Sequence, residues 1–195
     1  PSSPYSASKA SQDLIAKSFN STYKTNIRVI NLSNNYGPYQ FPEKFIPTLI
    51  FHFLKNKPAP IYGKGENIRE WTYVEDSSNA ILKTALSNKK FFNINIGSGK
   101  KVSNLEIAKI IFSIMKKRKL TRLTNQNYFK MVKDRPGHDI RYALNTKLFK
   151  EKINYKINKS LKAGLDETVS WYISNKSWLN SCLKKYNFDR LGLID

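Results

Sequence analysis

The chain has 195 residues, which fits one domain or a large piece of one, and its 40% apolar and 13% aromatic residues can supply a core. Its 34 basic and 14 acidic residues give a net charge of +20, which makes nucleic acid a candidate partner. Lysine outnumbers arginine 27 to 7, however, and is spread along the whole chain. Composition therefore favours a globular domain that does not bind nucleic acid.

The cysteine and histidine content and the lengths of the apolar runs bear on disulfides, metal sites and membrane spans. Cys182 is the only cysteine, so an intrachain disulfide framework and a cysteine metal cluster are excluded, and we expect a cytoplasmic protein. His52 and His138 are the only histidines, so we expect no metal site, and His52 should be a packed helix residue. No apolar run approaches the roughly 18 residues of a membrane span, so we expect no membrane partner.

Hydrophobic periodicity and turn residues predict alternating helices and strands. In chain order we expect a helix over 5–24 ended by Asn26, a strand over 27–32, a loop over 33–44, a helix over 45–54, and strands over 60–62 and 70–74. A helix over 77–87, with Asp76 as its N-cap, then leads to a strand over 91–96 and a helix over 104–117. Residues 120–144 should be mostly loops and short strands, followed by a helix over 160–175 and a packed tail over 176–195. Ser103 and Glu106 form a capping-box pattern. The alternation predicts an α/β fold, with the closing strands of a doubly wound parallel sheet and an interleaved small mixed lobe.

A Tyr-x-x-x-Lys pair, Tyr5 and Lys9, lies on the first predicted helix. Residues four apart share one helix face, so the lysine ammonium can stabilise a tyrosine phenolate that acts as a base. Pro4 supports a helix start here, and Ser6, Ala7 and Ser8 keep the surrounding face small. The spacing alone is equally compatible with an ordinary surface pair.

Two further segments carry candidate ligand-binding residues. Asn34 and Asn35 follow the predicted strand 27–32, and ligands of open α/β sheets bind at the carboxyl ends of strands. An ordinary Asn/Gly turn would look the same. The sequence DRPGHD over 134–139 combines a planar arginine fork with a stiff turn, which suits a diphosphate better than a metal, and Lys44 and Arg69 add positive charge.

Four segments in order, YSASK, SNNYGPYQFPEKFIP, PIYGKGENIREWTYVED and DRPGHD, resemble the dTDP-glucose 4,6-dehydratase family of the extended short-chain dehydrogenases/reductases. The resemblance runs over nearly the whole chain. It implies NAD-dependent dehydration of dTDP-glucose to dTDP-4-keto-6-deoxyglucose, a homodimer, and the C-terminal half of an NAD-dependent epimerase/dehydratase domain. Residues 1–60 would end a Rossmann-like core, and residues 60–195 would be largely substrate lobe with returning core strands.

The resemblance also assigns residues to roles. Tyr5 would be the catalytic base, and Lys9 would assist it and hold the nicotinamide ribose. The implied cofactor contacts are Tyr5, Ser6, Ala7, Ser8, Lys9 and Asn35. The implied substrate contacts are Asn34, Lys44, Phe45, Pro60, Ile61, Tyr62, Arg69, Asn104, Asp134, Arg135, Pro136, Gly137, His138 and Tyr186.

Two parts of the family pattern do not occur in the 195 residues. The glycine-rich fingerprint that binds the NAD pyrophosphate is missing, and so is the Thr-Asp-Glu segment whose carboxyl groups eliminate water in the family. We therefore expect a truncated or partial chain. Alternative readings are an inactive remnant or sugar-nucleotide-binding module, a related UDP- or GDP-sugar dehydratase or epimerase, and a basic nucleic-acid-binding protein.

Overall fold

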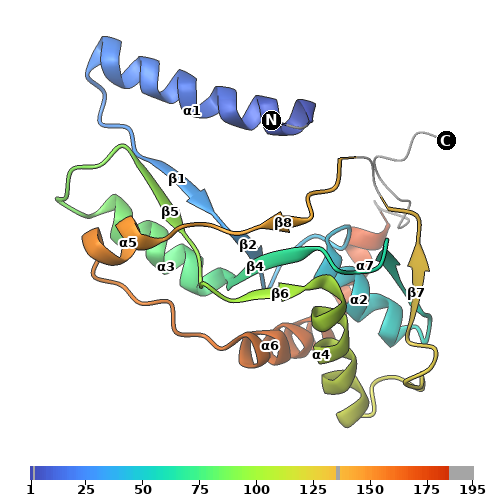
Figure 1. Ribbon diagram of the computed structural model, residues 1–195. Coiled ribbons are helices and arrows are strands. Elements are labelled where there is room, and N and C mark those ends of the chain that lie inside the picture. The colour runs from blue at the N-terminus through green and yellow to red at the C-terminus, as the bar shows by residue number, and fades with distance from the viewer. Residues whose placement is uncertain (2, 135–136, 185–195) are drawn as a thin grey trace.

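A computed structural model describes residues 1, 3–134 and 137–184 (Figure 1). Its helices are α1 (Pro4–Tyr23), α2 (Phe45–Leu54), α3 (Val74–Ala85), α4 (Asn104–Lys117), α5 (Lys147–Lys152), α6 (Leu161–Ser174) and α7 (Lys176–Leu183). Its strands are β1 (Val29–Leu32), β2 (Asn34–Tyr36), β3 (Ala59–Tyr62), β4 (Ile68–Tyr73), β5 (Asn93–Ile96), β6 (Lys101–Ser103), β7 (Phe129–Val132) and β8 (Arg141–Tyr142). Among the described residues, no helix is both long and apolar enough to cross a membrane.

Most strand pairs are parallel, which confirms the α/β class. β1 pairs with β5, and β2 continues the same direction but pairs with β4. The first half of β4 pairs with antiparallel β6 and with parallel β8, while β3 and β7 form a separate parallel pair. In Figure 1, α1 lies on one side of these strands, and α4 and α6 lie on the other.

Local sequence signals place several elements correctly. The predicted bounds of α2 and α4 match the structure, and Ser103 and Glu106 form the predicted capping box. The Ser103 hydroxyl accepts a hydrogen bond from Glu106 N at 3.2 Å, and a Glu106 carboxylate oxygen accepts one from Ser103 N at 2.7 Å. Helix ends of this kind are decided by neighbouring residues, which is why the sequence predicts them well.

The predicted loop over 33–44 is partly wrong, because it contains β2. Asn34 and Tyr36 pair in register with Trp71 and Tyr73 of β4. A three-residue strand rich in asparagine gives no periodic signal, and only the neighbouring strand makes it one. The structure also adds β6, α5 and α7, which were not predicted as elements.

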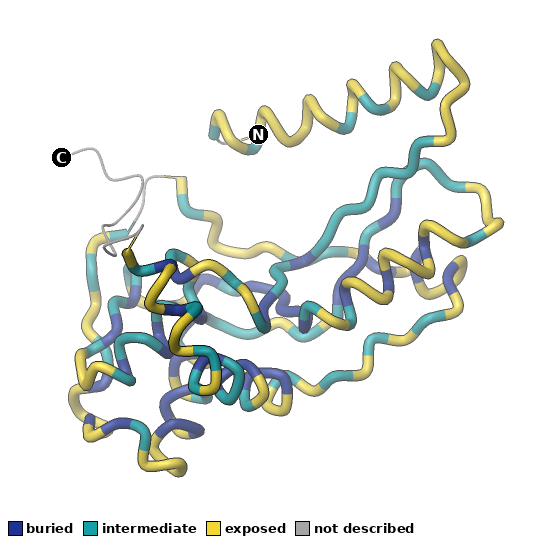
Figure 2. The backbone as a smooth tube through the Cα atoms, turned by 180° about the vertical axis from the view of Figure 1, so that it is seen from behind, coloured by how far each residue is buried: buried dark blue, intermediate teal, exposed yellow. Residues whose placement is uncertain are grey.

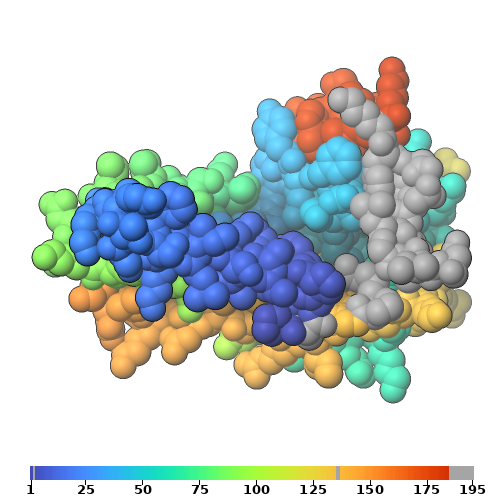
Figure 3. All heavy atoms as spheres, turned by 90° about the horizontal axis from the view of Figure 1, so that it is seen from above, coloured from blue at the N-terminus to red at the C-terminus, as the bar shows by residue number. Residues whose placement is uncertain are grey.

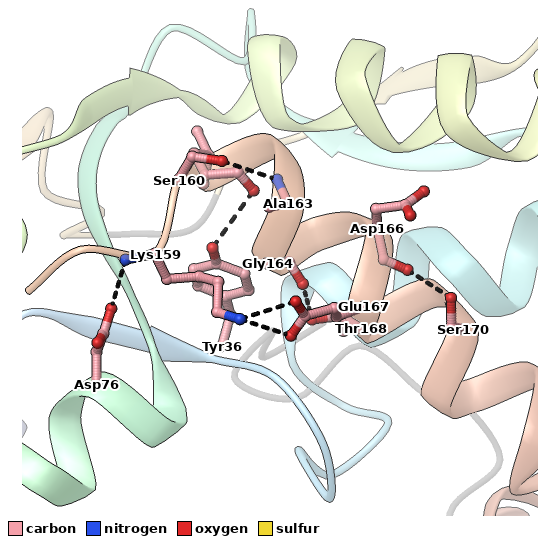
Figure 4. Close-up of polar contacts among 11 residues, drawn as sticks. Tyr36, Asp76, Lys159, Ser160, Ala163, Gly164, Asp166, Glu167, Thr168 and Ser170 are labelled. Carbon is pink, nitrogen blue, oxygen red and sulfur yellow. Dashed lines mark hydrogen bonds and ion pairs between the residues drawn. The ribbon is translucent and has the colours of Figure 1, made fainter.

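Asp76 is not the N-cap of the next helix. Strand β4 runs directly into α3, so Tyr73 is the cap residue and Asp76 lies in the first helical turn. Its carboxylate accepts a hydrogen bond from Lys159 N at 3.0 Å (Figure 4). It accepts a second one from Tyr155 Oη, also at 3.0 Å. The aspartate therefore ties the segment before α6 to α3 instead of closing its own helix.

The main core lies between α2, α4 and α6 and includes residues of β3 and β4 and of the segment leading into β7; we call this part the distal lobe. Phe53, Ile111 and Leu165 are each 0% exposed in it. Tyr36 is also buried, and its hydroxyl lies so close to α6 that a side chain at Gly164 would collide with it (Figure 4). A smaller core lies between α3, β5 and α5 and contains Ile94 and Phe149.

α1 has the predicted helix but not a buried apolar side. Ser3 and Ser6 cap its start, and Lys24 ends it in a left-handed conformation, two residues before the predicted Asn26. No residue of α1 is buried, and Leu14 and Phe19 are 68% and 49% exposed. Figure 2 shows this helix without a buried segment, in contrast to the distal lobe.

The C-terminal segment packs as predicted as far as residue 184. Trp178 contacts Trp171 and Tyr39, with ring centroids 5.0 and 5.7 Å apart, and Leu179 is 4% exposed. Residues 185–195 lie outside the described residues.

Candidate active site

Ser33 joins the carboxyl ends of three strands. Its backbone N–H donates to Ile96 O at 3.0 Å, and its hydroxyl lies 2.7 Å from that of Thr72. The Thr72 hydroxyl also accepts a hydrogen bond from Ser98 N at 3.0 Å. Because ligands of α/β sheets bind where parallel strands end, this buried polar junction marks the expected position of a site.

Asn34 and Asn35 lie on β2, directly after this junction. The Asn35 side-chain oxygen accepts a hydrogen bond from the Ser77 hydroxyl on α3, and Asn35 O accepts one from Gln40 Nε2 at 2.9 Å. Asn35 is therefore fixed by two segments. Asn34, the expected substrate contact, is half-buried and pairs with Trp71.

Tyr5 and Lys9 share one exposed face of α1. Lys9 Nζ lies 5.9 Å from the centroid of the Tyr5 ring and donates to Gln12 Oε1 at 3.2 Å. The Ser8 hydroxyl donates to Tyr5 O at 2.8 Å, and Ser6 belongs to the capping box. The ammonium therefore lies over the tyrosine ring. The side chains around both residues are small, and this face of the helix is exposed.

Tyr142 on β8 is a residue that the sequence analysis missed. Its hydroxyl donates to Leu32 O, at the end of β1, over 3.4 Å. Its pKa is raised mainly by burial and next by the proximity of Tyr5, with smaller effects from Glu70 and Asp139. Figure 3 shows the N-terminal end of α1 beside the segment that contains β8. The only sequence signal for Tyr142 as a site residue is its position four residues after His138.

His138 and Asp134 form the polar part of the DRPGHD turn. His138 Nδ1 lies 2.6 Å from Asp134 Oδ1, and the histidine side chain is 6% exposed. The His138 ring also meets the Tyr62 ring edge-on at 6.3 Å. This contact joins two segments that the sequence analysis assigned to one ligand. Gly137 lies at the turn with a positive φ, whereas Arg135, Pro136 and Tyr186 lie outside the described residues.

Arg69 holds the end of this turn against β4. Its guanidinium donates to Asp139 O at 2.7 Å and to Ile68 O at 2.8 Å, and the residue is 9% exposed. Asn67 Nδ2 also donates to Asp139 O, at 3.2 Å. In this structure the arginine therefore braces the DRPGHD segment as well as adding charge near it.

The other expected substrate contacts are spread around the distal lobe. Lys44 precedes α2 and forms an ion pair with Glu43 at 2.7 Å, and Phe45 stacks on Trp71. Pro60 is half-buried on β3, but the Ile61 side chain is 0% exposed and belongs to the core. Ile61 can therefore meet a ligand only through its backbone. Asn104 begins α4 and is 9% exposed.

β8 brings the two groups of candidate residues together. Tyr142 pairs in register with Arg69, and Arg69 in turn binds Asp139. The Tyr142 hydroxyl donates to Leu32 O at the end of β1, and Tyr5 is near enough to raise the pKa of Tyr142. The DRPGHD turn is therefore connected through β8 to the end of β1, and Tyr5 of α1 lies near this connection.

The described residues fit one end of a dinucleotide. Lys9 presents an ammonium group among the small residues of α1, and Asn35 on β2 presents an amide group, and both kinds of group can hydrogen-bond a nicotinamide ribose. No described turn has the glycine-rich form that binds a pyrophosphate before a helix. Any NAD would need further protein groups at that end.

Comparison with known proteins identifies the class of protein to which this fold belongs. The Rossmann-like α/β arrangement is shared with nucleotide-sugar dehydratases and epimerases of known structure. A family model described as GDP-mannose 4,6 dehydratase matches residues 1–168. The chain belongs to this 4,6-dehydratase family.

Curated relatives sharpen this resemblance. The chain is 38% identical to a dTDP-glucose 4,6-dehydratase of Escherichia coli over 100% of its own length, and 40% identical to one of Salmonella typhimurium over 93%. It covers 55% and 50% of these two proteins, so it spans about half the length of the curated relatives it matches. The predicted resemblance to dTDP-glucose 4,6-dehydratases is confirmed.

Solved structures show the same relationship. The dTDP-glucose 4,6-dehydratase of Bacillus anthracis, solved with NAD, has a TM-score of 0.84 and 37% identity, covering 93% of this chain and 56% of that one. The corresponding enzyme of Streptomyces venezuelae, solved with NAD and TYD bound, has a TM-score of 0.86 and 34% identity, covering 93% and 54%. The predicted Rossmann-like fold class is thereby confirmed.

Proposed function

We propose that this chain supplies the sugar-nucleotide site and the oxidising Tyr–Lys pair of an NAD-dependent dTDP-glucose 4,6-dehydratase. The observation that carries the proposal is the path through β8, in which Arg69 binds Asp139 of the DRPGHD turn, Tyr142 pairs with Arg69, and the Tyr142 hydroxyl reaches Leu32 O at the end of β1. A sugar nucleotide bound along this path would place its sugar near α1 and its diphosphate near the distal lobe. The product would be dTDP-4-keto-6-deoxyglucose.

Tyr5 would take the proton of the sugar 4-hydroxyl as C4 is oxidised. A bound NAD supplies the hydride acceptor for this step. Lys9 uses one of its three ammonium hydrogens on Gln12, so two remain for a ribose and for stabilising the tyrosine phenolate. Asn35, fixed by Ser77, would contact the same end of the cofactor.

The nucleotide would bind around the DRPGHD turn. His138 and Tyr62 join the two segments that frame it, and Asn104 lies at the start of α4. Arg69 and Arg135 would supply charge for the diphosphate, which pairs well with planar guanidinium groups. A homodimer and a cytoplasmic location remain predictions from the resemblance and the composition.

Calorimetry with dTDP, GDP and UDP tests the nucleotide site directly. We expect dTDP to bind the 195-residue chain most tightly and Arg69→Gln to weaken that binding. Preference for GDP or UDP would contradict dTDP-glucose as the substrate and favour a related sugar-nucleotide enzyme. No binding of any of the three would contradict the proposed site.

Turnover tests the chemistry, and it should be measured with a second polypeptide that carries the family's glycine-rich and Thr-Asp-Glu segments. We expect Tyr5→Phe to lower kcat at least about a hundredfold, because a general base contributes roughly that much or more. Tyr23→Phe, on the same exposed helix, is the matched control and should have no effect. Nucleotide binding without turnover in this mixture would instead indicate a binding module.

A further inference from the structure

A basic trough lies on the surface formed by β6, β8 and α5. It has a volume of about 840 Å³, and Gly99, Lys101, Arg141, Ala143, Leu144, Asn145, Thr146, Lys147, Lys150 and Glu151 line it. These residues come from segments separated by about forty positions along the chain. None of them belongs to the residues expected to bind NAD or the sugar nucleotide.

Most of the positive charge in the trough is not neutralised by the protein. Within the described part of the chain, the side chains of Lys101, Arg141 and Lys150 have no hydrogen-bond or ion-pair partner. Lys147 lies 3.9 Å from Glu151, a long and exposed contact. Three unpaired cations from three segments therefore converge on one hollow.

Two carboxylates lie at the trough, and neither fills it. Glu151 lines the rim, and Glu70 is 0% exposed beneath the floor. Glu70 Oε1 accepts a hydrogen bond from Gly99 N at 2.7 Å, and Oε2 accepts one from Leu144 N at 3.0 Å. The buried carboxylate thus holds two lining residues in place, and four cations outnumber the two carboxylates.

We propose that this trough binds a small ligand that carries two or more phosphates. Arginine offers a planar fork that suits phosphate oxygens, and the lysines supply point charges around it. The volume lies within the roughly 300–1,000 Å³ of small-molecule sites and exceeds the needs of a single phosphate. The Asn145 amide and the Thr146 hydroxyl add polar groups among the lysines.

The trough is separate from the proposed active site but adjoins it. Arg141 and Tyr142 are neighbours on β8, and successive side chains of a strand point to opposite faces. Arg141 lines the trough, whereas the Tyr142 hydroxyl reaches Leu32 at the end of β1. The proposal does not require the dehydratase function, because it rests on the trough alone.

Titration calorimetry with inorganic pyrophosphate tests the proposal on the full 195-residue chain. We expect saturable binding that Arg141→Gln weakens at least about tenfold, which corresponds to roughly 1.4 kcal/mol. Arg122→Gln is the control, since it removes the same charge from an exposed position outside the trough. It should change the affinity less than about twofold.

Three results would overturn the proposal. Pyrophosphate could fail to bind saturably, or Arg122→Gln could weaken binding as much as Arg141→Gln, which would indicate only the net charge of +20. Generic duplex DNA could also bind with the same dependence on Arg141, which would indicate a nucleic-acid surface. If Arg141→Gln lowers the melting temperature, Lys150→Gln replaces it, because this exposed lysine lies on α5 rather than in a strand.

Discussion

α1 and the distal lobe differ in how much of their sequence is buried. α1 buries none of its residues, although it carries Tyr5 and Lys9. The distal lobe buries whole side chains from five or more elements, including Phe53, Ile111 and Leu165. Figure 2 shows buried backbone segments there and none in α1. In the described residues, the Tyr–Lys pair proposed for chemistry therefore lies on an exposed helix, while the fully buried apolar side chains lie in another part of the molecule.

This contrast separates two kinds of mutational effect. Burial of apolar area stabilises a fold in proportion to the area removed from water, so the distal lobe should dominate unfolding. Substitutions of Tyr5 and Lys9 on α1 should affect turnover with little change in stability. Four stability measurements test the contrast, and they are given from the largest expected effect to the smallest.

Phe53→Ala should destabilise the protein by about 3–5 kcal/mol, because it empties a fully buried ring site. The Phe53 ring meets Phe112 and Tyr128 edge-on at 5.6 and 6.2 Å. Phe19→Ala on α1 should stay within about 0.5 kcal/mol. Urea unfolding followed by circular dichroism measures both, and equal losses for the two variants would abolish the contrast.

Glu70→Ala should cost about 1–3 kcal/mol, since it removes a fully buried carboxylate and leaves the partly buried N–H groups of Gly99 and Leu144 without this acceptor. Glu66→Ala, at an exposed position in the turn before β4, should have almost no effect. Hydrogen exchange at Gly99 and Leu144 should accelerate in the Glu70 variant alone. Unchanged exchange would show that the carboxylate does not hold these two segments.

Ser103→Ala should destabilise the distal lobe by about 1 kcal/mol, because it removes the N-cap of α4. Ser8→Ala on α1, whose hydroxyl makes only an exposed local bond, is the comparison and should be neutral. Thermal unfolding at neutral pH measures both. A larger loss in Ser8→Ala would place more stability in α1 than its exposure indicates.

The same cap predicts a pH dependence. Hydrogen bonds from the Ser103 backbone N–H and hydroxyl lower the pKa of Glu106 below its ordinary 4.5. A carboxyl with a lowered folded-state pKa contributes fully above the ordinary value and loses its contribution as pH falls through the lowered one. Glu106→Gln should therefore flatten the stability profile below pH 4.5. An unchanged acid profile would contradict this assignment.

The sequence predicted the parts of the fold that neighbouring residues decide. The capping box at Ser103 and Glu106, the bounds of α2 and the Tyr5–Lys9 spacing are all local patterns, and each is present in the structure. The ordered motifs also sufficed for the family, because they are short continuous segments. Local hydrogen bonds and helix periodicity act over a few residues and can be seen directly in a chain.

Only the tertiary structure decided which distant residues meet. β2 is a strand because β4 lies beside it, and Asp76 binds Lys159 rather than capping α3. The contact of Tyr142 with β1 and the trough around Arg141 join segments far apart in sequence, so no local pattern reveals them. Each of these contacts satisfies a backbone or side-chain polar group with a partner from a distant segment. The partner is therefore known only once the elements are packed together.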